Sequence, residues 1–294
     1  MNVLLRSAWN VYKTEGLRSL AIESLRYLSM YYTSDKIAKY WLHKLAGTDW
    51  VMREVQGSKM LLNLKEGGIH VDLYLNGIRE PRATRYLQSI LKPYMRVIDV
   101  GANIGYYALM EARKVDEVVA FEPVPANFET LEMNADLNNY SNIHLLNKAV
   151  GDREGTIGFT LSKASNWHRV STSVGDIDVS MITLDSVILD EIDFIRMDVE
   201  GYELNVLKGA ERILRENKLG MFIEVHNQIL NDYGYTAKEF YEFLAQYDYS
   251  IAKSFVMAPT TEGPTGKVAD ILKDKEAFNA LAIKSIASHV FFRR

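Results

Sequence analysis

Cysteine is absent from this chain of 294 residues. Without thiols the protein can form no disulfide, zinc–thiolate site or iron–sulfur cluster, and it can use no cysteine nucleophile. The absence fits a reducing compartment, so we expect a cytoplasmic protein. Apolar runs of about 18 or more residues are also missing, and the sequence therefore predicts no transmembrane helix.

Positive charge is not in excess. The chain has 34 Lys and Arg residues against 38 Asp and Glu residues, which gives a formal net charge of −4. A protein whose main partner is nucleic acid usually carries a basic surface, so this balance argues against RNA or DNA as a partner. Hydrophobic residues make up 48% of the chain and charged residues 24%, as in a globular protein with a sizeable core.

The first 80 residues differ in pattern from the rest. Apolar side chains recur there at three- and four-residue spacing, which predicts a helix. The residues that set this spacing are Leu17, Leu20, Ala21, Leu25 and Leu28. From Val51 to Leu75 the pattern becomes strand-like, with turns at 56–58 and 67–68. We expect an N-terminal extension over 1–80 and a main domain over 81–294.

The role of the N-terminal helix stays open. It can pack on the main domain or on a second subunit of a homo-oligomer. It can instead cover the active site, or lie on the cytoplasmic face of a membrane as a peripheral contact. Trp9, Tyr12 and Lys13 suit such an interface but do not require it.

The main domain begins with a helix over 80–92 and then alternates between short apolar runs and amphipathic segments. The runs predicted to be strands are 96–100, 117–121, 143–146, 194–197 and 221–225, and the predicted helices are 104–115, 125–137 and 203–215. This alternation predicts an α/β fold with a parallel sheet and helices on both faces.

Two segments break the alternation. Residues 157–160 and 179–182 read as strands around a polar loop that contains Trp167, His168 and Arg169. These loop side chains suit a sugar or phosphate, although a solvated loop would look the same. Between Tyr249 and Phe292, two apolar runs predict an antiparallel pair that closes the sheet.

The turn after the first strand of the main domain is the most informative segment. Asp99 ends the strand, and Gly101 and Gly105 follow it in a D-x-G-x-x-x-G pattern. Glycine lets the backbone turn sharply and approach a ligand, and ligands of this architecture bind at the carboxyl ends of the strands. The pattern therefore predicts a nucleotide-type cofactor.

The same turn discriminates between cofactors. A dinucleotide fingerprint needs a middle glycine, and Asn103 stands there instead. The Asp99 carboxylate would repel a pyrophosphate but suits the ammonium and sulfonium groups of S-adenosylmethionine. Glu122 directly follows the second strand, where it can accept hydrogen bonds from ribose hydroxyls.

These motifs resemble the FkbM family of S-adenosylmethionine-dependent methyltransferases. The resemblance extends from Val97 to His226, somewhat under half of the chain. Its motifs are 99–105, 121–123, 149–152, 183–185, 195–203, 206–210 and 223–226. One departure is Arg196, where the family more often has lysine.

The resemblance implies a Rossmann-like, seven-stranded, mostly parallel sheet of the class I methyltransferase type. It also implies O-methylation of a small molecule or glycan, with a lipid- or nucleotide-linked sugar of surface-polysaccharide or glycoprotein-glycan assembly as the acceptor. The positions that it assigns to the cofactor are Asp99, Gly101, Ala102, Asn103, Gly105, Glu122, Pro123 and Ala149.

Transfer of a methyl group to an alcohol needs a group that takes the alcohol's proton. Asp198, Glu200 and His226 follow the fourth and fifth strands, and we predict that they are catalytic. Glu203 is a further candidate, and for both Glu200 and Glu203 the alternative is that an acid near the start of a helix stabilises the helix without catalysis. We predict no metal ligands, with a divalent cation held by Asp198, Glu200, Glu224 and His226 as the alternative.

Rival functions can be weighed on the same residues. Adenine-N6 nucleic-acid methyltransferases need a Pro-Pro pair, and cytosine-C5 enzymes need a cysteine; this chain has neither. An inactive methyltransferase fold that serves a glycosylation complex is the non-enzymatic alternative. The intact Asp99, Gly101, Gly105 and Glu122 argue against it.

Overall fold

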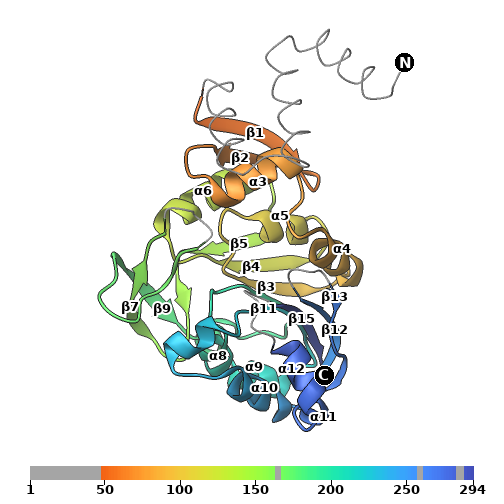
Figure 1. Cartoon of the computed structure of the whole chain (residues 1–294). Helices are drawn as coiled ribbons and strands as arrows, with labels where there is room; N and C mark the ends of the chain where they lie inside the picture. The colour runs from red at the N-terminus through yellow and green to blue at the C-terminus, as the bar shows by residue number, and fades with distance from the viewer. Residues whose placement is uncertain (1–47, 163–166, 257–260, 283–287) are drawn as a thin grey trace. The chain divides into compact units, whose positions relative to one another are not determined.

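A computed structural model describes residues 48–162, 167–256, 261–282 and 288–294. The chain divides into two compact units, and the described part of the first is 48–80, while the second begins at Pro81 and reaches the C-terminus (Figure 1). The helix predicted around 17–28 lies outside the described residues. Among those that are described, no helix has the length and apolarity needed to cross a bilayer.

The first unit contains a β-hairpin of β1 (Trp50–Val55) and β2 (Ser58–Asn63). The predicted turn lies between them, where Gln56 and Gly57 both have positive φ, of 50° and 83°. This two-residue loop gives the tight connection that antiparallel strands require.

A helix, α3 (Gly68–Asn76), follows the hairpin where we had predicted a strand. The prediction was wrong because Ile69, Val71, Leu73 and Leu75 alternate along the sequence like one face of a strand, and all four are buried in the helix. Arg53 of β1 donates to the Leu73 carbonyl oxygen at 2.9 Å, so the hairpin and the helix end are tied together.

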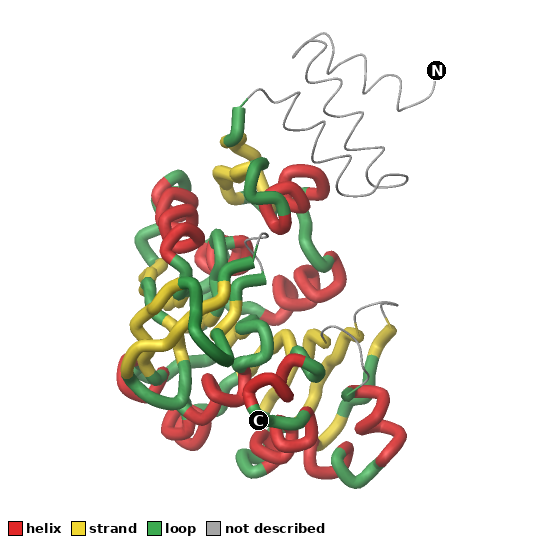
Figure 2. Tube along the Cα trace, turned by 60° about the vertical axis from the view of Figure 1, so that its left-hand side comes forward, coloured by secondary structure: helices red, strands yellow, loops and turns green. Residues whose placement is uncertain are grey.

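The second unit is built on a large mixed sheet (Figures 1 and 2). Its longer strands, from one edge to the other, are β5 (Ile143–Leu146), β4 (Glu117–Phe121), β3 (Arg96–Val100), β10 (Phe194–Met197), β11 (Gly220–Val225), β15 (Ser288–Arg293) and β12 (Ser250–Val256). The first five are parallel. As predicted, the two C-terminal strands close the sheet as an antiparallel pair.

The predicted count of seven strands is not confirmed, because the described residues form nine strands in this sheet. The two additional strands, β13 (Thr261–Glu262) and β14 (Gly266–Lys267), are two residues long and pair with β12. Such short pairings carry no hydrophobic repeat, so the sequence pattern could not reveal them.

Helices lie on both faces of the sheet (Figure 1). The described helices of this unit are α4 (Pro81–Ile90), α5 (Tyr106–Ala112), α6 (Pro125–Asp136), α7 (Leu184–Val187), α8 (Glu203–Lys208), α9 (Glu211–Glu216), α10 (Ala237–Ala245), α11 (Val268–Ile271) and α12 (Lys275–Leu281). Ile195 and Met197 of β10 lie in one core cluster with Leu204 and Phe240 of α8 and α10. Because side chains alternate along a strand, Arg196 faces the opposite way.

The opposite face is packed by α4 and α5. The Tyr86 ring of α4 lies against Phe222 and Phe291, with ring centroids 6.5 and 5.6 Å apart. Tyr107 of α5 lies under the Arg196 guanidinium, 4.3 Å from the ring centroid. The face that holds α5 therefore combines apolar packing with a buried charge.

The helix predicted over 203–215 is two helices, α8 and α9, separated at Gly209 and Ala210. A Cβ on Gly209 would meet the Gly151 carbonyl oxygen at 1.9 Å, so the two backbones touch there. This close approach accounts for a glycine inside an otherwise helical pattern.

A separate four-stranded sheet lies between β5 and α7 in the chain. Its order is β6 (Ala149–Val150), β9 (Ile177–Ile182), β7 (Gly155–Thr160) and β8 (Arg169–Val170). It is fastened to the 3₁₀ helix η1 (Ile229–Tyr233), which follows β11. Arg169 pairs with Asp232 at 2.9 Å, and the Tyr233 hydroxyl donates to the Val170 carbonyl oxygen at 2.9 Å.

Candidate active site at the carboxyl ends of the strands

The carboxyl ends of four neighbouring parallel strands bring the predicted residues to one edge of the sheet. Asp99 lies at the end of β3, Glu122 after β4, Asp198 after β10 and His226 after β11. Strands β4, β3, β10 and β11 are adjacent in that order. This edge is where ligands of doubly wound α/β proteins bind.

The glycine turn lies in close contact with the end of β10. Gly101 has φ of +83°, and a Cβ there would meet the Asp198 carbonyl oxygen at 1.9 Å. Gly105 has φ of +95° and directly precedes α5. Asn103 also has positive φ, of 52°, and its side-chain oxygen accepts from the Ile104 amide at 2.9 Å. Ala102 is buried in the turn.

Glu122 holds this turn against the end of β4. Its Oε2 accepts from the Asn103 amide at 2.8 Å and its Oε1 from the Val124 amide at 2.9 Å. Burial raises the pKa of Glu122 to about 7, against the effect of these two amides. The Asn127 side chain also hydrogen-bonds to this carboxylate, which can accept about four hydrogen bonds, so one acceptor position remains for a ribose hydroxyl.

The other two predicted cofactor residues flank this region. Pro123 follows Glu122, and the Asn147 side chain donates to the carbonyl oxygens of both, at 3.1 and 2.8 Å. Ala149 starts β6 and is buried in the apolar core. The sequence did not point to Asn147, whose side chain fixes the loop after β4.

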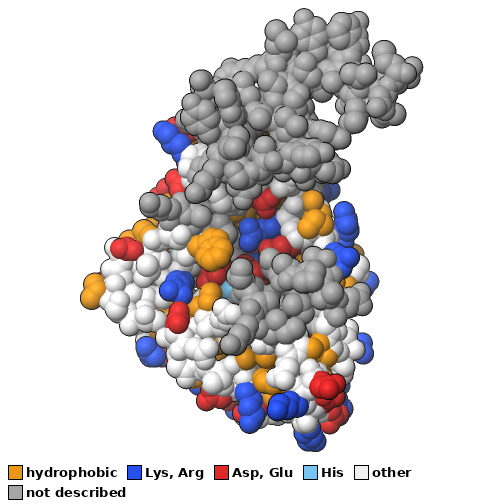
Figure 3. Space-filling model, in the orientation of Figure 1, with side chains coloured by type: hydrophobic (Ala, Val, Ile, Leu, Met, Phe, Trp, Pro, Cys, Tyr) orange, Lys and Arg blue, Asp and Glu red, His pale blue; other side chains and the backbone are white. Residues whose placement is uncertain are grey.

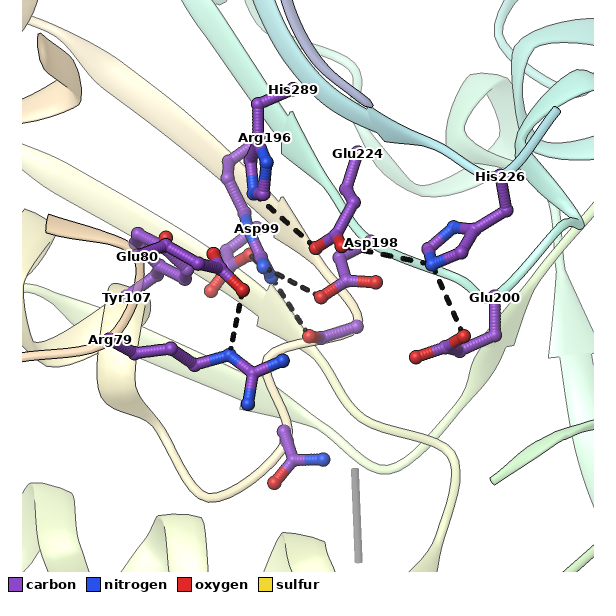
Figure 4. A network of polar contacts seen from close by, with 12 residues as sticks. Arg79, Glu80, Asp99, Tyr107, Arg196, Asp198, Glu200, Glu224, His226 and His289 are labelled. Atoms are coloured by element: carbon purple, nitrogen blue, oxygen red, sulfur yellow. Dashed lines mark hydrogen bonds and ion pairs between the residues drawn. The ribbon is translucent and has the colours of Figure 1, made fainter. Parts of the chain in front are cut away.

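Arg196 is the centre of a buried polar network (Figure 4). One nitrogen of its guanidinium donates to Asp99 Oδ1 at 3.1 Å and to the Gly101 carbonyl oxygen at 3.0 Å. The other donates to Asp198 Oδ2 at 3.0 Å. One side chain thus joins the predicted cofactor turn to a predicted catalytic residue.

The charges in this network are strongly perturbed. Burial alone would lower the pKa of Arg196, but Asp99 and Asp198 hold it above its ordinary value. Glu111 of α5 is fully buried, and burial and the nearby Asp99 raise its pKa well above 4.5. Both influences therefore favour the protonated form of Glu111.

His226 is surrounded by carboxylates. Its Nδ1 lies 3.0 Å from Glu203 Oε1, and its Nε2 lies 3.2 Å from Glu200 Oε2 and 3.8 Å from Glu224 Oε1. Glu224 in turn contacts His289 of β15 at 3.4 Å. Figure 3 shows acidic, basic and histidine side chains close together near the centre of the face that it draws.

The protonation states of this cluster differ from those of isolated side chains. Burial lowers the pKa of His226, but the hydrogen bond to Glu203 and the surrounding carboxylates outweigh it and raise the pKa well above 6.5. Burial and the charge of Asp198 raise the pKa of Glu200 to about 8. These carboxylates thus favour the protonated form of His226, which disfavours it as the proton acceptor.

The donor atoms of Asp198, Glu200 and His226 lie within 4.8 Å of one another, a spacing that can hold a metal ion. The prediction that this site has no metal ligands stays a prediction.

Three features of the site carried little signal in the sequence. The Arg196–Asp99 pair arises because β10 and β3 place these residues side by side. The contact of Glu224 with His289 depends on the pairing of β11 with β15. Glu203 gave a helix-terminal pattern, whereas its carboxylate turns back toward His226.

The predicted loop of aromatic and basic residues lies partly in β8. Trp167 is exposed, and the His168 Nδ1 accepts from the Ser162 amide at 2.9 Å. Arg169 is engaged with Asp232. A role for these side chains in acceptor binding stays a prediction.

The chain is similar in sequence to known methyltransferases. The profile of the methyltransferase FkbM domain matches residues 99–251. A hexuronic acid methyltransferase, AglP, of Haloferax volcanii is 33% identical over an alignment of 134 residues, and the match covers 44% of this chain and 54% of that protein. The 2-O-methyltransferase NoeI of Sinorhizobium fredii is 28% identical over an alignment of 188 residues, and the match covers 53% of this chain and 76% of that protein.

Among solved structures, a methyltransferase FkbM of Methylobacillus flagellatus has a TM-score of 0.43 and 18% identity. The similar region covers 76% of this chain and 52% of that one. The chain spans between 54% and 60% of the length of the first curated relatives that it matches. Since the FkbM profile matches just over half of the 294 residues, the chain belongs to the FkbM methyltransferase family.

Proposed function

We propose that this protein is an S-adenosylmethionine-dependent O-methyltransferase that acts on a sugar hydroxyl. The observation that carries the proposal is the second oxygen of Asp99. Asp99 Oδ1 is bound to Arg196, whereas Oδ2 is buried and has no hydrogen-bond partner among the described residues. A buried acceptor without a partner is costly unless a ligand supplies a donor.

The residues at this edge fit the cofactor. The ammonium group of S-adenosylmethionine can donate to Asp99 Oδ2, and Glu122 can accept from the ribose. Asn103 and Glu122 hold the glycine turn in place, at 2.8 Å, before any ligand binds. When bound, S-adenosylmethionine supplies an electrophilic methyl group on a positively charged sulfur.

The acceptor side of the site lies at Asp198 and Glu200. Both side chains are partly exposed, at 21% and 17%, so an acceptor can reach them. Asp198 is held by Arg196 and is suited to orient the acceptor hydroxyl. Glu200 is suited to take its proton, because a base works best when its pKa lies near the working pH.

The reaction would then balance as follows. Asp99 and Glu122 would hold the cofactor, which would supply the methyl carbon to the acceptor oxygen and leave as the neutral thioether. The hydroxyl proton passes to Glu200. The contribution of the protein is positioning, together with exclusion of water around the charges.

A sugar acceptor is supported by the relatives. AglP is named for a hexuronic acid and NoeI for a 2-O-methyl transfer. The chain matches 54% of AglP, and the acceptors to compare are neutral, acidic, lipid-linked and nucleotide-linked sugars.

Calorimetric titration of the full chain with S-adenosylmethionine, S-adenosylhomocysteine and NAD tests the cofactor. We expect micromolar binding of the first two, about −8 kcal/mol, and none of NAD. Binding of NAD alone would contradict the proposal. The Asp198→Asn variant should bind S-adenosylhomocysteine as the wild type does, but transfer methyl groups to hexose and hexuronic acid acceptors far more slowly.

A further inference from the structure

Glu203, His226 and Glu200 form a row that leads from the core to the open edge of the sheet. The Glu203 side chain is 0% exposed, the His226 side chain 4% and the Glu200 side chain 17%. The ring of His226 lies between the two carboxylates, with 3.0 Å on the Nδ1 side and 3.2 Å on the Nε2 side. The histidine therefore contacts both the inner and the outer acid.

The Glu203 carboxylate is held in place by a second contact. Glu203 is the first residue of α8, and its Oε1 also accepts from the Gly201 amide at 3.0 Å. Gly201 has φ of +99°, and a Cβ there would meet the Ile229 side chain at 2.5 Å. An acid that merely stabilised the helix terminus would point at the α8 amides, whereas this carboxylate points back at His226.

The arrangement fixes which ring nitrogen faces the acceptor side. With Nδ1–H donating to Glu203, Nε2 faces Glu200. A second proton on Nε2 makes the ring a cation that can donate to both carboxylates. The negative charge of Glu203 favours that cation, and the cation favours the ionised form of Glu200.

Other titratable groups face this row from each packed element. Asp198 follows β10, and Glu224 lies on β11 with His289 of β15 behind it. The hydroxyl groups of Tyr233, from η1, and Tyr241, from α10, lie near Glu203. Apart from the two histidines, these groups are acids. Among the groups named here, His226 is therefore the one whose protonated, positively charged ring lies directly against Glu200.

We propose that Glu203 is a positioning residue for methyl transfer: it holds the protonated His226 ring against Glu200 and so keeps the Glu200 carboxylate ready to take the acceptor's proton. The proposal rests on the function proposed above, because it assigns Glu200 as the base. It also makes a claim about His226 that holds whether or not methyl transfer is observed.

The sign of the effect follows from the contacts. Glu203→Gln keeps a side-chain oxygen for Nδ1–H but removes the charge that favours the imidazolium. His226 then loses its second proton at lower pH, and Glu200 loses its nearest cation. Direct repulsion between Glu203 and Glu200 also disappears, but it acts on Glu200 more weakly than the charge of His226 does.

The direct test is a nuclear magnetic resonance titration of the full-length protein. We expect Glu203→Gln to lower the titration midpoint of the His226 ring by about one unit or more and to raise that of the Glu200 carboxyl. The His226→Gln spectrum identifies the ring among the six histidines. Glu216→Gln, an exposed charge removal on α9, is the matched control and should change neither midpoint.

The kinetic test is the pH profile of kcat/KM. Glu203→Gln should move the acid limb of this profile to higher pH by about one pH unit. The value of kcat/KM then falls about tenfold at pH values below the limb and changes little on the high-pH plateau. His226→Gln should move the limb in the same direction. In the double variant, the Glu203 change should add little, because Glu203 acts through His226.

Several results would overturn the proposal. An unchanged His226 midpoint in Glu203→Gln would do so, as would equal loss at every pH, which indicates a purely structural role. If Glu203→Gln does not fold, the acid limb of kcat/KM and the titration midpoint of Glu200 are measured in His226→Gln instead. A Glu200 midpoint that does not shift in that variant refutes the proposal. Failure of every sugar acceptor would count against the function proposed above, while the His226 titration would still decide the role of Glu203.

Discussion

Replacement of Gly101 by alanine tests whether the glycine turn and the end of β10 form one packed unit. The new Cβ would lie 1.9 Å from the Asp198 carbonyl oxygen, whereas ordinary contact begins at 3.4 Å, so the two backbones must separate by about 1.5 Å. The positive φ alone costs about 1–2 kcal/mol, and overpacking adds about 1–3 kcal/mol. We expect a total loss of about 3 kcal/mol.

Gly234 provides a matched control. Its φ of +82° is almost the same as the +83° of Gly101, but a Cβ there would have no neighbour within 4 Å. Gly234→Ala should therefore lose only about 1 kcal/mol, the cost of the backbone conformation. The difference between the two variants isolates the contact with Asp198.

Urea unfolding followed by circular dichroism measures both losses. Turnover of the folded Gly101→Ala protein should also fall by about a hundredfold, because a shift of about 1 Å misplaces Asp198. The reasoning is refuted if Gly101→Ala is no less stable than Gly234→Ala and binds S-adenosylhomocysteine with unchanged affinity.

Two further predictions concern buried charges. Arg196→Lys keeps the positive charge, but an ammonium lacks the forked guanidinium that reaches Asp99 and Asp198 together. We expect the free energy of unfolding to fall by about 1–3 kcal/mol and the affinity for the cofactor to decrease, as measured by urea unfolding and calorimetry. Wild-type stability and affinity would contradict this. Burial lowers the pKa of His70 from 6.5 to about 4. As the pH falls, the unfolded state therefore binds a proton at His70 before the folded state does. The stability that the neutral ring gives to the 48–80 unit is present above pH 6.5 and is lost as the pH falls toward 4. The loss is about 2 kcal/mol at pH 5, which faster amide exchange in β1 and β2 should reveal; exchange protection that does not change with pH, or a His70→Gln variant that keeps the dependence, would contradict this.

The alternating strands and helices of the second unit were predictable because each strand is a short apolar run between turn residues. The runs at 96–100, 117–121, 143–146 and 194–197 match β3, β4, β5 and β10 residue for residue. The errors occurred where a local pattern had two meanings. The alternation of α3 resembles a strand, and the pattern over 203–215 does not show that Gly209 must touch Gly151.

The candidate site was predictable only as a set of strand ends. Asp99, Glu122, Asp198 and His226 each follow an apolar run, and parallel strands bring such ends to one edge. The partner of each side chain depends on strand register, which is a property of the folded sheet. Arg196 illustrates this, because its contact with Asp99 joins residues 97 positions apart.

The attachment of the four-stranded sheet to η1 has a consequence for exchanging segments between relatives. Arg169 and Val170 are bound by Asp232 and Tyr233, which lie far beyond the end of this sheet in the chain. The peptide that directly follows β11 is thereby coupled to β8, the edge strand of this sheet. A chimera that replaces residues 149–182 alone would lose both contacts. A functional chimera must therefore also take residues 229–233 from the same parent.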